Sequence, residues 1–144
     1  MTRYLDDFEV GQRFDLGSFS LTPEDIIAFA ERYDPLSFHL TDDPNGPFGG
    51  LIASGWQTGS ECQALLVKGF LANAASLGSP GLDQVRFLQP VRPDTVYAAS
   101  FVIREVIASQ KRPDRGRILG RLELKDPQEI LVYSWDGLTI LARR

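Results

Sequence analysis

A long apolar helix, followed by a half of the chain that reads as strands, constrains the fold more than any other feature of this sequence. Residues 55–71 place Trp56, Cys62, Leu66 and other small or apolar residues three to four positions apart, which predicts a helix. A helix that is apolar over so much of its surface is mostly buried. Beyond it, alternating apolar residues and turn residues predict strands near residues 82–88, 95–108, 117–124 and 130–141.

Short polar breaks separate these strands, and consecutive strands joined by such turns favour an antiparallel meander. We therefore expect an α+β fold, in which an antiparallel sheet of about five strands curls around one long central helix. The helix would fill the concave face of that sheet.

The part of the chain before the long helix is mixed. Apolar residues alternate over residues 14–21, which predicts a short strand. Thr22 and the proline after it fit the cap and first position of an amphipathic helix. That helix should end at Asp34, because the next residue is a proline. The dense Pro and Gly of residues 35–50 predict a loop, and residues 78–81 are expected to end this half.

Composition sets the class of protein. The 144 residues fit one domain, 1–144, and 15 Lys and Arg against 19 Asp and Glu give a net charge of -4, which argues against nucleic-acid binding. One cysteine and one histidine exclude an internal disulfide or a thiolate zinc site, so we expect no metal. The start lacks the apolar core of a signal peptide, and no stretch reaches the ~18 apolar residues of a membrane helix. We expect a cytoplasmic protein that binds no membrane.

The only histidine of the chain, His39, lies five residues after Asp34 on a segment constrained by proline. A carboxylate and an imidazole that lie close together form an acid/base pair, because the imidazole changes charge near neutral pH and the carboxylate orients it or shares a water. A lone histidine near an aspartate is more often structural. A further feature is therefore needed to favour a catalytic role for His39 over a structural one.

Gly55, at the expected start of the long helix, supplies that feature. The first backbone N–H groups of a helix have no internal partner, and the helix dipole adds positive charge there. Such donors polarise a carbonyl oxygen, and glycine lets a substrate approach the main chain closely. Plain turn geometry is an equally common reason for a glycine at this point.

Over nearly its whole length the chain resembles the MaoC-like dehydratase family, which includes the (R)-specific enoyl-CoA hydratases and has the hot-dog fold. Two stretches carry the resemblance most clearly. They are residues 34–55, from Asp34 through His39 to Ser54-Gly55, and the segment Arg86-Phe87-Leu88-Gln89-Pro90-Val91-Arg92-Pro93-Asp94-Thr95. The resemblance implies that Asp34 and His39 hold the catalytic water and move its protons. It also implies that the Gly55 N–H contacts the thioester carbonyl.

Several residues depart from the family pattern. Pro35 follows Asp34 directly, and Ser37 stands where proline is usual. Ser54-Gly55 replaces a common His-Gly, and Pro93-Asp94 replaces a usual Gly-Asp. The acid/base pair is retained, so the departures indicate a subgroup with a different substrate.

The remaining candidates come from the same segment and from one predicted turn. Phe48, Gly49, Ser54 and Trp56 are the candidate substrate-binding residues, although a helix cap is the favoured role for Ser54. The predicted turn carries four cations, Lys111, Arg112, Arg115 and Arg117. They could hold the phosphates of coenzyme A or the acidic surface of an acyl carrier, but a solvated turn is the default.

The sequence therefore predicts a hydratase or dehydratase that acts on an acyl thioester, with no cofactor other than the coenzyme A of the substrate. A hot-dog acyl-CoA thioesterase and a non-catalytic acyl-thioester-binding protein are the alternatives. An exposed sheet edge is a liability unless it is paired, and hot-dog proteins typically dimerise through it, so we expect a homodimer or a higher homo-oligomer.

Overall fold

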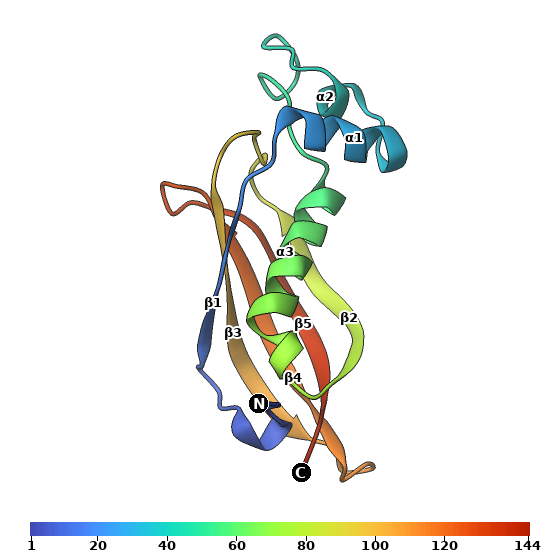
Figure 1. The fold of residues 1–144 in the computed structure, drawn as a ribbon, viewed down its shortest axis with the longest axis vertical. Helices are drawn as coiled ribbons and strands as arrows, with labels where there is room; N and C mark the ends of the chain where they lie inside the picture. The colour runs from blue at the N-terminus through green and yellow to red at the C-terminus, as the bar shows by residue number, and fades with distance from the viewer.

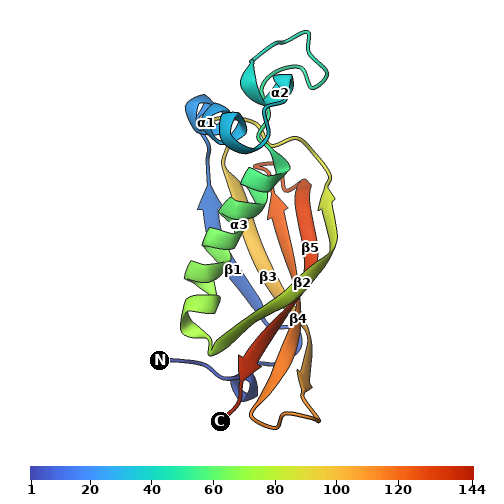
Figure 2. The ribbon, with the colours of Figure 1, turned by 90° about the vertical axis from the view of Figure 1, so that its right-hand side faces the viewer.

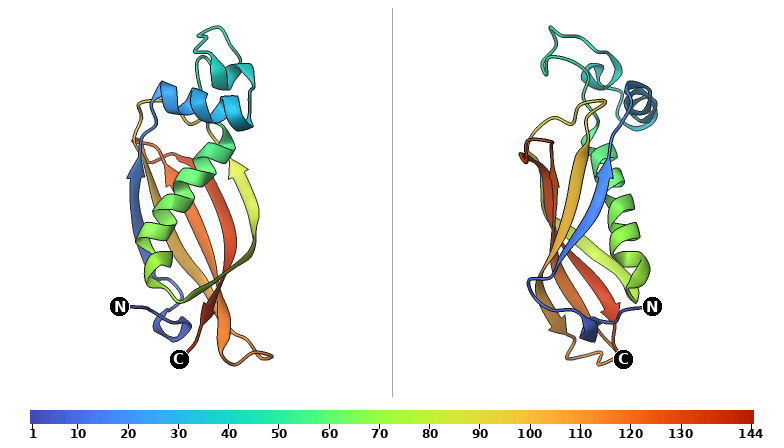
Figure 3. Two further views of the ribbon diagram at one scale, coloured as in Figure 1. Left: turned by 45° about the vertical axis from the view of Figure 1, so that its right-hand side comes forward. Right: turned by 60° about the vertical axis from the view of Figure 1, so that its left-hand side comes forward.

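The computed structural model describes all residues 1–144 and contains one antiparallel sheet with a helix across one face (Figure 1). Its strands are β1 (Arg13–Phe19), β2 (Ser76–Phe87), β3 (Tyr97–Ala108), β4 (Arg115–Lys125) and β5 (Leu131–Ala142). The helices are α1 (Pro23–Tyr33), α2 (Ser37–Leu40) and α3 (Gly55–Gly69), with short 3-10 turns at Leu5–Asp7 and Leu71–Asn73. The sheet twists strongly around α3 (Figures 2 and 3), and this confirms the predicted hot-dog fold.

The strand order is β1-β3-β4-β5-β2, so the predicted meander is correct only for β3, β4 and β5. The strand that follows α3 pairs with β5, the last strand, and lies at the opposite edge from β1. Residues 89–94 are therefore a crossover rather than a hairpin turn. They carry the chain past the end of the sheet near the start of α3.

Local signals in the sequence define the start and the end of α1. Thr22 accepts a hydrogen bond from the Asp25 N–H, and the Asp25 carboxylate accepts one from the Thr22 N–H, which is the reciprocal capping pattern of a helix start. The prediction that α1 ends at Asp34 is confirmed. The predicted loop 35–50 contains the single-turn helix α2, which carries His39.

Two predictions about this region were wrong. Residues 78–81 lie inside β2 rather than ending the first half, and Gly78 and Gly81 have φ angles of 105° and 159° that interrupt the pairing with β5. The helix α3 is buried on one face only, because Trp56 is 71% exposed and Val67 is 41% exposed.

The core fills the space between α3 and the sheet. Cys62 and Leu66 of α3 belong to a cluster of 22 buried residues that also contains Phe101, Ile118 and Leu122 from the sheet. Alternation along β4 directs Ile118 and Leu122 to the helix side. No helix in the structure combines the length and the apolar character needed to cross a membrane.

The packing of α1 and α2 determines where the functional candidates lie. These two helices cover one end of the sheet, above the start of α3, and both chain termini lie at the other end (Figures 1 and 3). The end of α1, the whole of α2 and the first turn of α3 are therefore brought together.

Candidate functional site

Asp34 and His39, predicted as an acid/base pair, lie side by side. The His39 Nε2 atom is 3.4 Å from Asp34 Oδ2, and the side chains are 7% and 24% exposed. The other ring nitrogen, Nδ1, lies 2.7 Å from the carbonyl oxygen of Ile52. Because a carbonyl oxygen can only accept, Nδ1 carries the proton of this hydrogen bond, and in the neutral ring Nε2 is the free base. The ring is thus held with its basic atom toward Asp34.

Ser54 links Asp34 to the start of α3. Its hydroxyl donates to Asp34 Oδ2 at 2.7 Å and accepts from the Trp56 N–H at 3.3 Å. The predicted cap is confirmed, but the hydrogen bond to Asp34 was not predicted. It joins residues twenty positions apart, and no local pattern indicates it. The Ser54 side chain is fully buried, and its hydrogen bond orients the Asp34 carboxylate.

Gly55 is the first residue of α3, and its N–H has no hydrogen-bond acceptor within the chain. The ring of Phe87, at the end of β2, lies directly over this glycine. A Cβ atom at position 55 would be 2.5 Å from Phe87 Cε1, so no side chain fits without displacing the ring. Close packing, rather than an unusual backbone angle, therefore favours glycine here. The first N–H of the 15-residue helix is left as a free donor at its positive end.

These groups surround one pocket of about 440 Å³. All three predicted catalytic residues line it, as do Phe48 and Trp56 from the predicted substrate-binding set. Gly49 and Ser54 do not line it. The other lining residues are mostly apolar, as expected of a site for a small molecule with a few placed polar groups.

The inner part of the pocket was missed at the sequence level. It is formed by the buried residues Thr58, one turn into α3, and Val132 and Tyr133 of β5, and the more exposed Phe87 of β2 also lines the pocket. Helical spacing from Gly55 is a signal that could have found Thr58. Nothing local could have found Tyr133, because it reaches the pocket from the last strand.

Burial raises the pKa of Tyr133 to about 12, with a smaller contribution from Cys62. Burial also raises the pKa of the Cys62 thiol to about 12, with a smaller contribution from Glu61. Both groups therefore stay protonated near neutral pH. The expectation that Cys62 is a buried thiol is confirmed, and its lack of reactivity follows from the low thiolate population.

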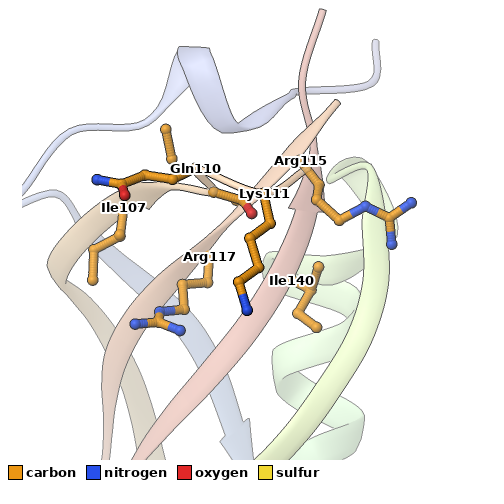
Figure 4. Close-up of a pocket in the computed structure, with 9 residues that line it drawn as sticks. Ile107, Gln110, Lys111, Arg115, Arg117 and Ile140 are labelled. Atoms are coloured by element: carbon orange, nitrogen blue, oxygen red, sulfur yellow. The ribbon is translucent and has the colours of Figure 1, made fainter. Parts of the chain in front are cut away.

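The predicted basic turn forms a separate hollow. Lys111, Arg115 and Arg117 line a space of about 550 Å³ between β3 and β4 (Figure 4). This hollow also includes Ile140, which is seven residues from Tyr133 on β5. At about 3.3 Å per residue the two positions are about 23 Å apart. The turn is thus at the far end of the sheet from Asp34 and His39, and Arg115 is already paired with Asp114 at 3.1 Å.

Comparison with known proteins identifies the family and two similar proteins. A model of the MaoC-like domain matches residues 7–117 of this chain. The uncharacterized protein YdeM of Bacillus subtilis is 32% identical over 144 residues, covering 97% of this chain and 99% of its own length. The crystal structure of a MaoC-like dehydratase from Rhodospirillum rubrum is 28% identical, has a TM-score of 0.87, and matches over 99% of this chain and 98% of that one.

A more distant structure has the same fold. The R-hydratase PhaJ1 of Pseudomonas aeruginosa is 21% identical and has a TM-score of 0.71, over 98% of this chain and 86% of its own. At this identity the likeness shows a shared fold. The chemistry has to be argued from the residues of the pocket.

Proposed function

Because the chain belongs to the MaoC-like dehydratase family, we propose that it adds water to a 2-enoyl-CoA to give a 3-hydroxyacyl-CoA, or catalyses the reverse dehydration. One observation carries the proposal: Asp34, His39 and the unpartnered N–H of Gly55 line the same largely apolar pocket. The activity named for the R-hydratase PhaJ1, which shares the fold, supports the same class of reaction.

In the proposed mechanism, water is held between the Asp34 carboxylate and His39 Nε2. With Nδ1–H donated to the Ile52 carbonyl, Nε2 is free to take a proton as the water oxygen bonds to C3 of the enoyl group. The C2–C3 double bond opens toward the thioester, and its electron pair is carried as enolate charge on the carbonyl oxygen. The proton is then returned to C2. General acid/base catalysis of this kind typically contributes about 10²–10⁴-fold.

The Gly55 N–H would donate to the thioester oxygen as its negative charge grows. Donors fixed before the reaction cost no reorganisation, and the loss of one typically lowers kcat by about 10²–10³-fold. The mechanism uses only groups of this chain, and coenzyme A enters as part of the substrate.

The test is turnover of a panel of trans-2-enoyl-CoA thioesters, from short to medium chains, with the stereochemistry of the product scored. Asp34→Asn and His39→Ala should both lose hydration, while their circular dichroism should show that both variants remain folded. Glu31→Gln is a matched control, because it makes the same type of change as Asp34→Asn on the exposed side of α1, and it should keep full activity.

The same assay separates the alternatives. Release of free CoA without a 3-hydroxyacyl product would instead favour a thioesterase. Binding of CoA thioesters without turnover of any member would favour a non-catalytic binding protein. Full hydration activity in either Asp34→Asn or His39→Ala would contradict the assigned roles.

We also propose that the protein is a homodimer joined through β2. Only Val85 of this strand is partly buried, and every other residue is exposed. Leu77 is 47% exposed and Leu82 is 46% exposed along this sheet edge. A second copy that pairs with the edge would cover these side chains and satisfy the free backbone groups.

Sedimentation of the wild type and of Leu77→Lys tests this dimer. The wild type should sediment as a dimer, and Leu77→Lys should sediment partly or wholly as a monomer. Val10→Lys, at an apolar position that is 65% exposed away from β2, should remain dimeric. A monodisperse wild-type monomer at micromolar concentration would refute the proposal.

A further inference from the structure

The inner end of the pocket carries two hydroxyls that have no partner in the chain. They belong to Thr58 and Tyr133, which line the pocket and are 2% and 4% exposed. Gln57 Oε1 is the only side-chain polar atom that is both fully enclosed and without a hydrogen bond. The Thr58 and Tyr133 oxygens bond to no other group of the chain, so each keeps some exposed surface. The pocket is the space that both residues line.

Tyr133 closes the pocket between the sheet and the helix. It extends from β5 to α3, where its phenol oxygen is 3.1 Å from the position that a Cβ atom of residue 59 would occupy. Its ring also stacks against Phe87, with centroids 5.5 Å apart. Thr58 lies three residues after Gly55 on α3, about 4.5 Å along the helix axis. An acyl chain whose thioester is held at Gly55 would therefore reach Thr58, and Tyr133 beside Gly59, after a short distance.

The charges around the pocket determine which polar group fits there. No lysine or arginine lines it, and Asp34 is the only acidic residue in the lining. A carboxylate on the acyl chain would have no cation to pair with at the inner end. A neutral oxygen would accept hydrogen bonds from both hydroxyls, and the raised pKa of Tyr133 keeps that donor protonated.

An apolar chain at this position would leave both hydroxyls dry and unpaired. Leaving a buried donor without a partner costs about 1–3 kcal/mol, which corresponds to roughly 5- to 150-fold in affinity. The inner end is therefore built to discriminate between an oxygen and a methyl group at the same place.

We propose that the substrate is a short 2-enoyl thioester whose acyl chain bears a neutral oxygen, a hydroxyl or a carbonyl, bound by Thr58 and Tyr133. This substrate class rests on the proposed hydration. It adds a specificity site to the catalytic groups, and it assigns the two hydroxyls a function that the reaction itself does not require.

The first test is binding, so that it does not depend on turnover. Saturated CoA thioesters are compared in isosteric pairs by calorimetry: 4-hydroxybutanoyl-CoA with pentanoyl-CoA, and 5-hydroxypentanoyl-CoA with hexanoyl-CoA. We expect the hydroxylated member of at least one pair to bind about tenfold more tightly or better. Tyr133→Phe, which keeps the ring, and Thr58→Val, which keeps the shape, should each reduce that preference. Tyr4→Phe, the same change at the other end of the molecule, should leave it unchanged.

Equal or weaker binding of the hydroxylated member in both pairs would overturn the inference. A preference that survives in both Tyr133→Phe and Thr58→Val would overturn it as well. The matching 2-enoyl pairs are then assayed for hydration. If neither member is hydrated although the binding preference holds, the proposed reaction fails and the specificity site stands. If both are hydrated equally well and bound equally well, the reaction stands and the specificity site fails.

Discussion

Replacing Ser54 by alanine tests the link between the start of α3 and the acid/base pair. The change removes one oxygen from a fully buried position and breaks two hydrogen bonds together. One is the bond that the hydroxyl donates to Asp34, and the other is the bond that it accepts from the Trp56 N–H. The backbone of the helix is left as it was.

The expected loss of stability is about 2 kcal/mol. Loss of an N-cap costs typically about 1 kcal/mol. A hydrogen bond to a charged group is worth about 1.5–3 kcal/mol, but Asp34 is 24% exposed and water can replace part of this contact, so we assign it about 1 kcal/mol. For a chain of this length, 2 kcal/mol corresponds to a decrease in Tm of roughly 7 °C.

Thermal unfolding and steady-state kinetics provide the assay, with Thr22→Ala as the matched control. Thr22 caps α1 through the Asp25 N–H but does not contact Asp34, so its loss should lower Tm by roughly half as much and leave kcat unchanged. Ser54→Ala should also lower kcat by about 10- to 100-fold, because a small displacement of a catalytic group has a large effect on rate. Equal decreases in Tm for the two variants, or an unchanged kcat in Ser54→Ala, would contradict the link between Ser54 and Asp34.

Three further predictions concern the core and the pocket. Gly120→Ala should destabilise the protein by about 1–3 kcal/mol in chemical denaturation, because its Cβ would overlap the buried ring of Phe101; an unchanged midpoint would contradict the packing. The Cys62 thiol, whose pKa burial raises to about 12, should stay unmodified by a thiol reagent at pH 8 and react when guanidinium unfolds the chain. Gly55→Ala should stay folded, since the exposed ring of Phe87 can turn away. It keeps the N–H but places a methyl group where the thioester would approach it, so hydration should fall about tenfold or more; undiminished activity would argue against close approach of the substrate to this N–H.

The sequence was sufficient to predict the elements that local interactions determine. The cap at Thr22 and the end of α1 at Asp34 depend on residues within a few positions of each other, and the strands β3 to β5 are joined by turns with clear breaking residues. The pairing of β2 with β5 was not predictable in this way. It joins residues such as Ser76 and Leu141, which are far apart in the chain, so no local signal indicates it.

The candidate site also contains residues that local sequence could predict and residues that it could not. The spacing of Asp34 and His39 was informative because α2 brings a short segment back onto the end of α1. The role of Tyr133 could not be predicted, because its ring reaches the pocket only after β5 has paired with its neighbours and α3 has packed on the sheet. Of the two groups proposed to determine specificity, Thr58 lies one turn after Gly55 on α3 and only Tyr133 comes from a distant strand, whereas the acid/base pair comes from one segment.

The Ser54 hydroxyl explains how the two parts of the proposed chemistry keep their spacing. A hydroxyl has one proton to donate and two lone pairs to accept with, so Ser54 holds Asp34 and the first turn of α3 at the same time. Asp34 Oδ2 is thereby occupied by Ser54 and faced by His39, and Oδ1 is left for a water molecule. Because the same residue precedes Gly55 in the chain, any movement of the helix start also moves the hydrogen bond that orients the carboxylate. One small buried side chain, Ser54, therefore fixes the position of the Gly55 N–H relative to Asp34 and His39.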